Sequence, residues 1–132
     1  EEAVTAFQVA VNDADEEELK NLVPSYITAN KALVEEILPA VQETHYTAID
    51  IIKVTEWTAA EVDSFNDQIQ VTHGKTADAK EGVTLRLGLR GKMTDKNGVL
   101  RQYQEVELNF IKIKGVWYPD IEDVQDKLFT RE

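Results

Sequence analysis

The chain of 132 residues contains no cysteine. Without a thiol it can form neither a disulfide nor a thiolate metal site, and thiol catalysis is excluded. No stretch approaches the roughly 20 apolar residues of a membrane-spanning helix, so we expect no span. The chain also lacks a glycine-rich phosphate loop, a Gly-x-Ser-x-Gly elbow and an Asp-x-Asp-x-Asp-Gly calcium loop. We therefore expect no catalytic residue of a known motif, no metal site and no cofactor.

Positive charge is scarce, because 14 basic residues face 25 acidic ones and leave a net charge of −11. This excess argues against nucleic acid and anionic membranes as partners. The charge is uneven: residues 1–50 carry −9 and residues 83–118 carry +4, a pattern typical of solvated helix faces and ordinary strand edges. Apolar residues make up 42% of the chain, which is enough to bury a core. Length and composition predict one domain over residues 1–132.

Residues 83–118 predict a long antiparallel hairpin followed by a shorter one. The chain reverses at 95–98, because Asn97 and Gly98 tolerate positive φ. Apolar residues then face each other on one side of the hairpin, as Met93–Leu100, Leu87–Val106, Leu85–Leu108 and Val83–Phe110. The other side carries Thr84–Asn109, the opposite-charge pair Arg86–Glu107, Gly88–Glu105 and Arg90–Tyr103. A slip of one residue would mix the two faces, so this is the register we expect.

A second reversal is predicted at Lys114-Gly115. Its cross-strand partners are Ile113–Val116 and Lys112–Trp117. In this register Trp117 shares the inner face with Leu108 and Phe110. The outer face carries the apolar residues Ile111, Ile113, Val116 and Tyr118. An exposed apolar cluster typically marks an interface, so we expect a homodimer or a partner-docking surface here. The alternative is that another segment, such as 124–129, covers the cluster.

Helical periodicity dominates the first third of the chain. Val4, Phe7 and Val11 recur at helical spacing, and Asp15 begins a capping box for a second helix. Pro39 is expected to kink or stop a third helix. We predict helices over about 2–42, a strand over about 46–57, a short helix over about 59–70 and antiparallel strands over about 83–121. Helices segregated from an antiparallel sheet define an α+β fold, in which the amphipathic helices cover the apolar face of the sheet.

Two segments carry a family resemblance: the amphipathic helix that runs into an acidic break, VAVNDADEEELKNLV, and the late Gly-x-Trp of IKGVWYPDI. The chain resembles the nuclear transport factor two-like, or cystatin-like, superfamily, and most of all its small bacterial extracytoplasmic or lipoprotein-borne members. The resemblance implies a curved sheet wrapped around helices as a cone with a pocket. The superfamily includes isomerases, dehydratases and proteins without enzymatic activity, so the fold does not select the function. The helical region around Pro24 to Pro39 is longer than in the compact enzyme members.

Four residues are candidate ligand-binding groups. Gln102 and Gln104 point inward in the predicted register, at the mouth of the expected cavity. Trp57 and Trp117 are candidates for its walls, because ligand pockets combine apolar walls with a few polar groups. The alternatives are strands that run past the helices into water, and tryptophans that serve core packing.

Three residues are candidates for general acid–base chemistry. The enzymes of the resembled superfamily use a buried acid or an Asp–His pair. Asp50 is the best-placed acid, but strand alternation turns it to solvent. His45 and His73 are the two histidines, and neither has a sequence neighbour that makes a proton relay.

We therefore expect a non-enzymatic, extracytoplasmic binding or protein-interaction domain, secreted or lipid-anchored, whose partner is a small molecule or a protein. The alternative is a small-molecule isomerase or lyase that acts in the cavity between sheet and helices. A third possibility is a structural module of a longer surface protein. The first residue is Glu rather than Met, so we expect a processed or trimmed chain.

Overall fold

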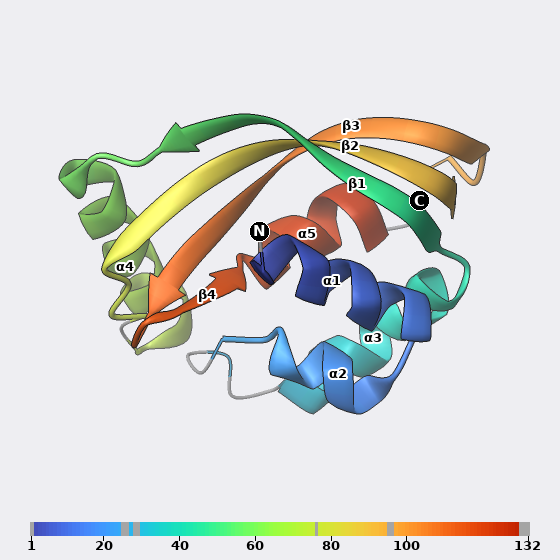
Figure 1. Cartoon of the computed structure of the whole chain (residues 1–132). Coiled ribbons are helices and arrows are strands. Elements are labelled where there is room, and N and C mark those ends of the chain that lie inside the picture. Colours follow the sequence, from blue (N-terminus) through green and yellow to red (C-terminus); the bar gives the residue numbers. More distant parts are fainter. Residues whose placement is uncertain (1, 25–26, 28–29, 76, 95–96, 130–132) are drawn as a thin grey trace.

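A computed structural model describes residues 2–24, 27, 30–75, 77–94 and 97–129. Four strands form one antiparallel sheet in the order β1-β2-β3-β4, with the bounds β1 (His45–Glu56), β2 (Glu81–Thr94), β3 (Leu100–Ile113) and β4 (Val116–Pro119). The helical segments are α1 (Glu2–Asp13), α2 (Glu16–Asn21), α3 (Asn30–Gln42), α4 (Ala59–His73), α5 (Ile121–Val124) and a π-helical turn, η1 (Gln125–Phe129). The open, curved sheet arches over α1, α2, α3 and α5, and α4 lies at one end of it (Figure 1). The fold is α+β, as predicted.

The register of the long hairpin is confirmed from Val83–Phe110 to Arg90–Tyr103. Its alternating leucines are buried against the helices, and Leu87 and Leu108 have no solvent exposure. Beyond Arg90 the pairing shifts by one residue, so that Met93 faces Arg101 instead of the predicted Leu100. The shift follows Gly91, where a Cβ atom would lie only 2.1 Å from the carbonyl oxygen of His45. Sequence alternation alone does not reveal such a bulge.

Two further irregularities bend β1, at Tyr46/Ala48 and at Ile51/Lys53. Ile51 faces Leu87 before the second irregularity and Val54 faces Leu85 after it, so both side chains lie on the concave face of the sheet. Bulges of this kind increase the local twist and bend the strand. The curvature of the sheet therefore follows from these extra residues together with the bulge at Gly91.

Helix α1 packs under the start of β1. Val4, Phe7 and Val11 are buried, as their helical spacing predicts, and the ring of Phe7 lies 6.1 Å from that of Tyr46. Helix α3 continues through Pro39 to Gln42, so of the two predicted effects of this proline, a kink or a stop, the stop is wrong. Proline removes one intrahelical hydrogen bond, but Pro39 lies on the exposed side of α3, where water can satisfy the freed carbonyl. No helix among the described residues is long and apolar enough to cross a bilayer.

The C-terminal segment covers the free edge of β3. Beyond the short strand β4, the backbone N–H of Asp120 donates to the carbonyl oxygen of Asn109 at 2.8 Å. The carboxylate of Asp123 accepts from the backbone N–H of Asn109 at 3.3 Å, and Lys127 Nζ donates to the carbonyl oxygen of Glu107. These contacts pair backbone groups that would otherwise form an open sheet edge, which is a template for aggregation.

Candidate ligand-binding sites

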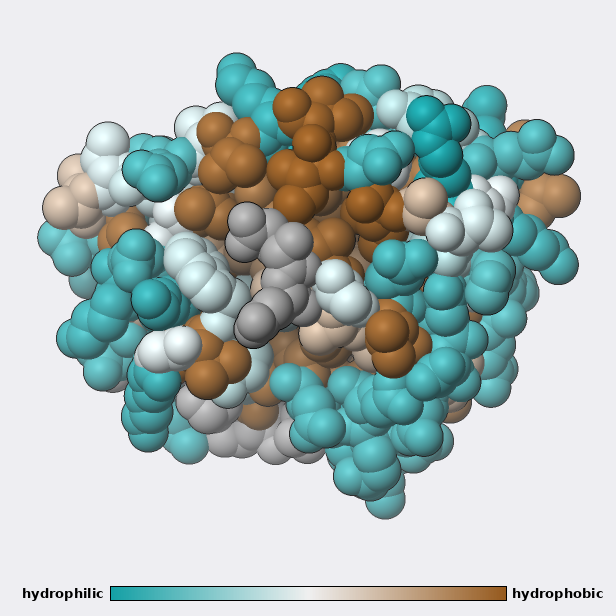
Figure 2. Space-filling model, viewed as in Figure 1, coloured by the Kyte–Doolittle hydropathy of each residue, from teal (hydrophilic) through white to brown (hydrophobic). Residues whose placement is uncertain are grey.

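An apolar groove lies beneath the arch of the sheet, between the N-terminal half of α1 and the β3–β4 hairpin. It has a volume of about 790 Å³. Figure 2 shows hydrophobic surface gathered at this place, below the sheet and above α1. The lining residues are Ala3, Val4, Ala6, Val54, Glu56, Val83, Leu85, Phe110, Gly115, Val116 and Trp117. A cavity of this size with predominantly apolar walls is typical of a ligand site.

The groove exists because small residues of α1 face large inward residues of the sheet. Ala3 and Ala6 leave space that longer side chains would fill. Glu56 is the one charged residue in the lining; its side chain is exposed, and no described residue forms an ion pair with it. The groove therefore combines apolar walls with a carboxylate at its rim that no residue in the described part of the chain pairs with.

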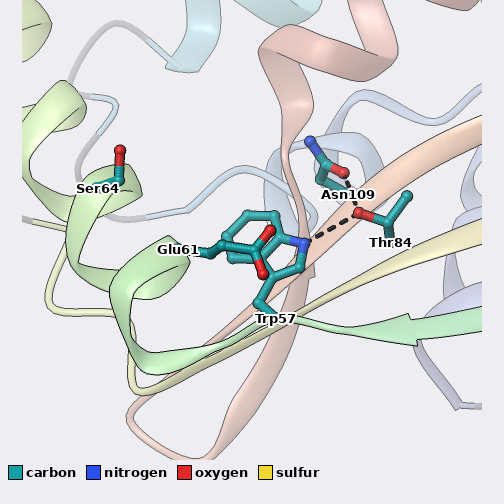
Figure 3. A pocket seen from close by; sticks show the side chains of 5 residues that line it. All are labelled: Trp57, Glu61, Ser64, Thr84 and Asn109. Carbon is teal, nitrogen blue, oxygen red and sulfur yellow. Dashed lines mark hydrogen bonds between the residues drawn. The ribbon is translucent and has the colours of Figure 1, made fainter.

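A second, polar pocket of about 320 Å³ lies where α4 meets the outer face of the sheet. Its lining residues are Trp57, Glu61, Ser64, Thr84 and Asn109 (Figure 3). Trp57 Nε1 donates to Thr84 Oγ1 at 2.9 Å, and this hydroxyl donates to Asn109 Oδ1 at 2.8 Å. The two bonds join the end of β1 to both strands of the long hairpin.

Helix α4 forms the other wall of the polar pocket. A capping box begins the helix, in which Glu61 N donates to Thr58 Oγ1 at 3.2 Å and Thr58 N donates to Glu61 Oε1 at 2.9 Å. The box holds the Glu61 side chain back against the first turn of α4. Ser64 lies one turn further along, with an exposed side chain.

The four predicted ligand-binding residues do not share one site. Trp57 lines the polar pocket and Trp117 lines the groove. Gln104 is half-buried opposite Leu89 and Gln102 is exposed, and neither lines the groove or the polar pocket. Trp117 faces Lys112, which follows Gln104 by eight residues on β3, or roughly 27 Å of strand. The glutamines therefore lie near the opposite end of the sheet from Trp117.

Sequence reasoning missed most of the residues around the polar pocket. Thr84 and Asn109 were predicted as a cross-strand pair, but nothing in the sequence shows that Trp57 reaches across to them. The one available signal is the glycine at position 82, where a Cβ atom would lie 2.1 Å from Trp57 Cε3. Glycine there lets the indole lie directly on β2.

The expected exposed cluster on the outer face is wrong for two of its four residues. Ile111 and Ile113 are 0% and 4% exposed, whereas Val116 is 51% exposed and Tyr118 is half-buried. Ile111 faces Gly82, over which Trp57 lies, so this end of the outer face is covered by Trp57 and α4. The predicted pairings of the short hairpin, Ile113–Val116 and Lys112–Trp117, are confirmed.

Charged residues fill the rest of the outer face. Arg86 faces Glu107 as predicted, but its ion pair is made diagonally with Glu105, at 2.8 Å. Hydrogen bonds from Arg86 and from the Tyr103 hydroxyl lower the pKa of the Glu105 carboxyl. Arg90 lies 5.0 Å from the centre of the Tyr103 ring and 3.3 Å from a carboxylate oxygen of Asp50. Asp50 is exposed on this face, as strand alternation predicts.

The remaining titratable candidates lie away from both cavities. Burial raises the pKa of the Asp120 carboxyl from 3.8 to about 6, with a further contribution from the nearby Asp123 carboxylate. Asp120 lines neither the groove nor the polar pocket. His73 Nε2 lies 2.9 Å from the Glu122 carboxylate and links α4 to α5. No group of three or more potential metal ligands occurs within the described part of the chain.

Comparison with known proteins gives no match: no family model, no curated protein and no solved structure matches this chain. The resemblance to the nuclear transport factor two-like superfamily therefore stays a prediction from the sequence. The function is therefore inferred from the chemistry of the two cavities.

Proposed function

We propose that this chain is a non-enzymatic binding domain that holds an apolar ligand in the groove between α1 and the sheet. The groove itself is the observation that carries the proposal, since its 790 Å³ is lined almost entirely by apolar side chains from α1 and all four strands. Burial of a ligand there would remove apolar surface from water, at about 25 cal/mol per Å².

Charge narrows the class of ligand. Glu56 has no partner among the described residues, and the chain as a whole carries −11. The Glu56 carboxylate at the rim favours a cationic group over an anionic one. The proposed ligand is therefore an apolar molecule with a positively charged group, such as an alkyl ammonium.

Fewer observations support the alternative function, an isomerase or lyase that acts in the same cavity. Such an enzyme needs an acid or base aimed at the substrate, with a pKa matched to the task. Asp120 has a raised pKa but lies outside both cavities, and Glu56 is exposed at the rim of the groove. A binding role requires neither residue to transfer a proton.

Alkyl chains with different head groups test this function. Decyltrimethylammonium, decyl sulfate and decanol have the same alkyl tail and differ in the head group. Their binding is followed by the fluorescence of Trp117, which lines the groove, in a Trp57→Phe variant. We expect saturable binding of the ammonium compound at least about tenfold tighter than that of the sulfate. Glu56→Gln should reduce this preference, and Glu36→Gln, an exposed carboxylate on α3, should not. Equal binding of all three compounds in both variants would contradict the charge argument, and no binding would contradict the function.

The family and the location are separate proposals. Helices beneath a curved, open sheet agree with the architecture that the resemblance implies, and this agreement supports membership of the superfamily. An extracytoplasmic location, secreted or lipid-anchored, depends on the same resemblance. The sequence of the full-length precursor tests it: an upstream lipobox or signal peptide is expected, and a precursor with neither would contradict it.

A homodimer through the outer face is a separate proposal. Ile111 and Ile113 are too deeply buried to contribute, so the contact would depend on Val116 and Tyr118. Sedimentation velocity of the wild type should then show a dimer that Val116→Glu converts to a monomer. A wild type that sediments as a monomer at all concentrations would exclude this contact.

A further inference from the structure

The polar pocket beneath α4 is separate from the groove and has the chemistry of a different ligand. Trp57 forms part of its wall, Thr84 and Asn109 line it from the sheet, and Glu61 and Ser64 line it from α4. In Figure 3 Thr84 and Asn109 lie on one side of the indole, the Glu61 carboxylate overlaps the indole in this view, and Ser64 lies farther away on α4. We propose that this pocket binds a neutral sugar unit, a single hexose ring that is either free or at the end of a glycan.

The hydrogen-bond relay fixes the orientation of the Asn109 amide. The indole N–H of Trp57 can only donate, so Thr84 Oγ1 accepts there and uses its own hydrogen for Asn109 Oδ1. The amide oxygen of Asn109 is thereby engaged. Its Nδ2 carries two further N–H donors, and no described residue accepts from them. In Figure 3 this nitrogen is turned away from Thr84, toward the α4 side of the pocket.

Helix α4 supplies acceptors to the same pocket. Glu61 uses Oε1 in the capping box, and its Oε2 has no bond from a described residue. The Ser64 hydroxyl likewise has no described partner and can both donate and accept. The pocket therefore offers N–H donors from the sheet, a carboxylate and a hydroxyl from the helix, and the aromatic ring of Trp57.

This arrangement matches the surface of a sugar. Each sugar hydroxyl donates one hydrogen bond and accepts others, so adjacent hydroxyls can satisfy the Asn109 amide and the Glu61 carboxylate together. The C–H face of the ring is apolar and suits the indole of Trp57. The volume of 320 Å³ lies at the small end of ligand pockets, which limits the occupant to about one ring. The Glu61 carboxylate and the net charge of −11 disfavour phosphorylated or acidic sugars.

Three contacts hold the Trp57 side chain in the wall of the pocket. Trp57 lies on Gly82, packs against Phe65 with ring centres 5.7 Å apart, and is bonded to Thr84. A side chain fixed in this way loses little conformational entropy on binding.

Side-chain amide and indole NMR signals of the ¹⁵N-labelled protein test the proposal. Titration with glucose, galactose and mannose to about 50 mM should shift the Asn109 amide pair and the Trp57 indole N–H together, with a Kd on the order of millimolar for at least one sugar. Methyl glycosides distinguish the source of the unit. If a methyl glycoside binds as tightly as the free sugar or more tightly, the ligand is the end of a glycan. If the glycoside binds more weakly, the ligand is a free sugar.

Asn109→Asp replaces the two N–H donors with an acceptor and keeps the bond from Thr84, so sugar affinity should fall at least about tenfold. Gln70→Glu makes the same change of charge near the far end of α4 and should leave the affinity unchanged. Glu61→Gln keeps the capping bond and should weaken binding several-fold, which provides a second test if Asn109→Asp fails to fold. A variant that retains decyltrimethylammonium binding in the groove is folded, so the two sites can be judged separately.

Three results would overturn the proposal. The first is the absence of any shift at Trp57 and Asn109 with all three sugars, and the second is wild-type affinity in the Asn109→Asp variant. The third is tighter binding of a nucleoside such as uridine, because this would show that the pocket selects a flat base over a hydroxylated ring.

Discussion

Asn12 holds the backbone of Tyr46 by both of its polar groups. Its Oδ1 accepts from Tyr46 N at 2.7 Å, and its Nδ2 donates to Tyr46 O at 2.8 Å. Gln8 donates to the same carbonyl oxygen at 3.1 Å. An amide side chain of α1 therefore satisfies backbone groups of β1 as a neighbouring strand would, and it fixes the helix that forms one wall of the groove.

Removal of the Asn12 amide, here called the Asn12 clamp, should destabilise the fold. Asn12→Ala leaves Tyr46 N–H, in a half-buried environment, without its acceptor, and we expect a loss of about 1–3 kcal/mol in the free energy of unfolding. Asn21→Ala, at the exposed end of α2, is the matched control and should change the free energy of unfolding by less than about 0.5 kcal/mol. Urea unfolding measures both. Equal midpoints for the two variants would show that the clamp contributes nothing.

Stability should depend on the titration of Asp120. Its pKa is 3.8 ordinarily and about 6 in the fold, so the folded state binds the proton more tightly than the unfolded state does. The stabilisation from this proton is complete below about pH 4 and is lost as the pH rises through 6, a change of about 3 kcal/mol.

Asp120→Asn removes this dependence, because an amide stays neutral at every pH. The variant should be more stable than the wild type at pH 7, by up to about 3 kcal/mol, and the difference should shrink toward pH 4. Thermal unfolding of both proteins from pH 4 to 7 measures it. A stability difference that does not vary with pH would assign the effect to packing instead of titration.

Gly82 should tolerate a methyl group far less well than Gly88. A Cβ at position 82 would lie 2.1 Å from Trp57 Cε3, whereas one at position 88 would lie 3.0 Å from the hydroxyl at the flexible end of Tyr103. We expect Gly82→Ala to cost about 1–3 kcal/mol and to displace the indole from the polar pocket. Gly88→Ala should cost less than half as much. Chemical denaturation and the Trp57 indole NMR signal check the two variants, and similar costs would show that the indole can move aside freely.

The cover over the edge of β3 should suppress association. Val124 of α5 is 0% exposed, and a charge at this position cannot be buried without a partner. Val124→Asp should therefore detach α5, expose the backbone groups of Glu107 and Asn109, and lead to oligomers or aggregates. Asp126→Asn, an exposed change in η1, is the control. Light scattering during mild heating separates the two, and a variant that stays monomeric would contradict the role of α5 as an edge cover.

The strands and helices could be predicted from the local periodicity of the sequence. The features that depend on long-range contacts could not. The register from Val83 to Arg90 follows from alternation with a period of two, which one slip would reverse. The bulge after Arg90 and the continuation of α3 through Pro39 depend on neighbouring backbone and on solvent, which alternation does not encode.

The cavities could be predicted only in part. Trp117 was placed on the inner face by the turn at Lys114-Gly115, and it does line the groove. The distance between α1 and the sheet, which opens the groove, is a property of packing. Gln102 and Gln104 line neither the groove nor the polar pocket, because the register alone does not show which part of the inner face stays open.

Filling the groove tests the central claim most directly. Ala6 lines the groove from α1 and is exposed, and Val9 is exposed on the same helix but lies outside the lining. Calorimetric titration with decyltrimethylammonium should show at least about a tenfold weaker Kd for Ala6→Trp than for the wild type, and an unchanged Kd for Val9→Trp. Equal affinities of Ala6→Trp, Val9→Trp and the wild type would contradict the claim that this groove is the binding site.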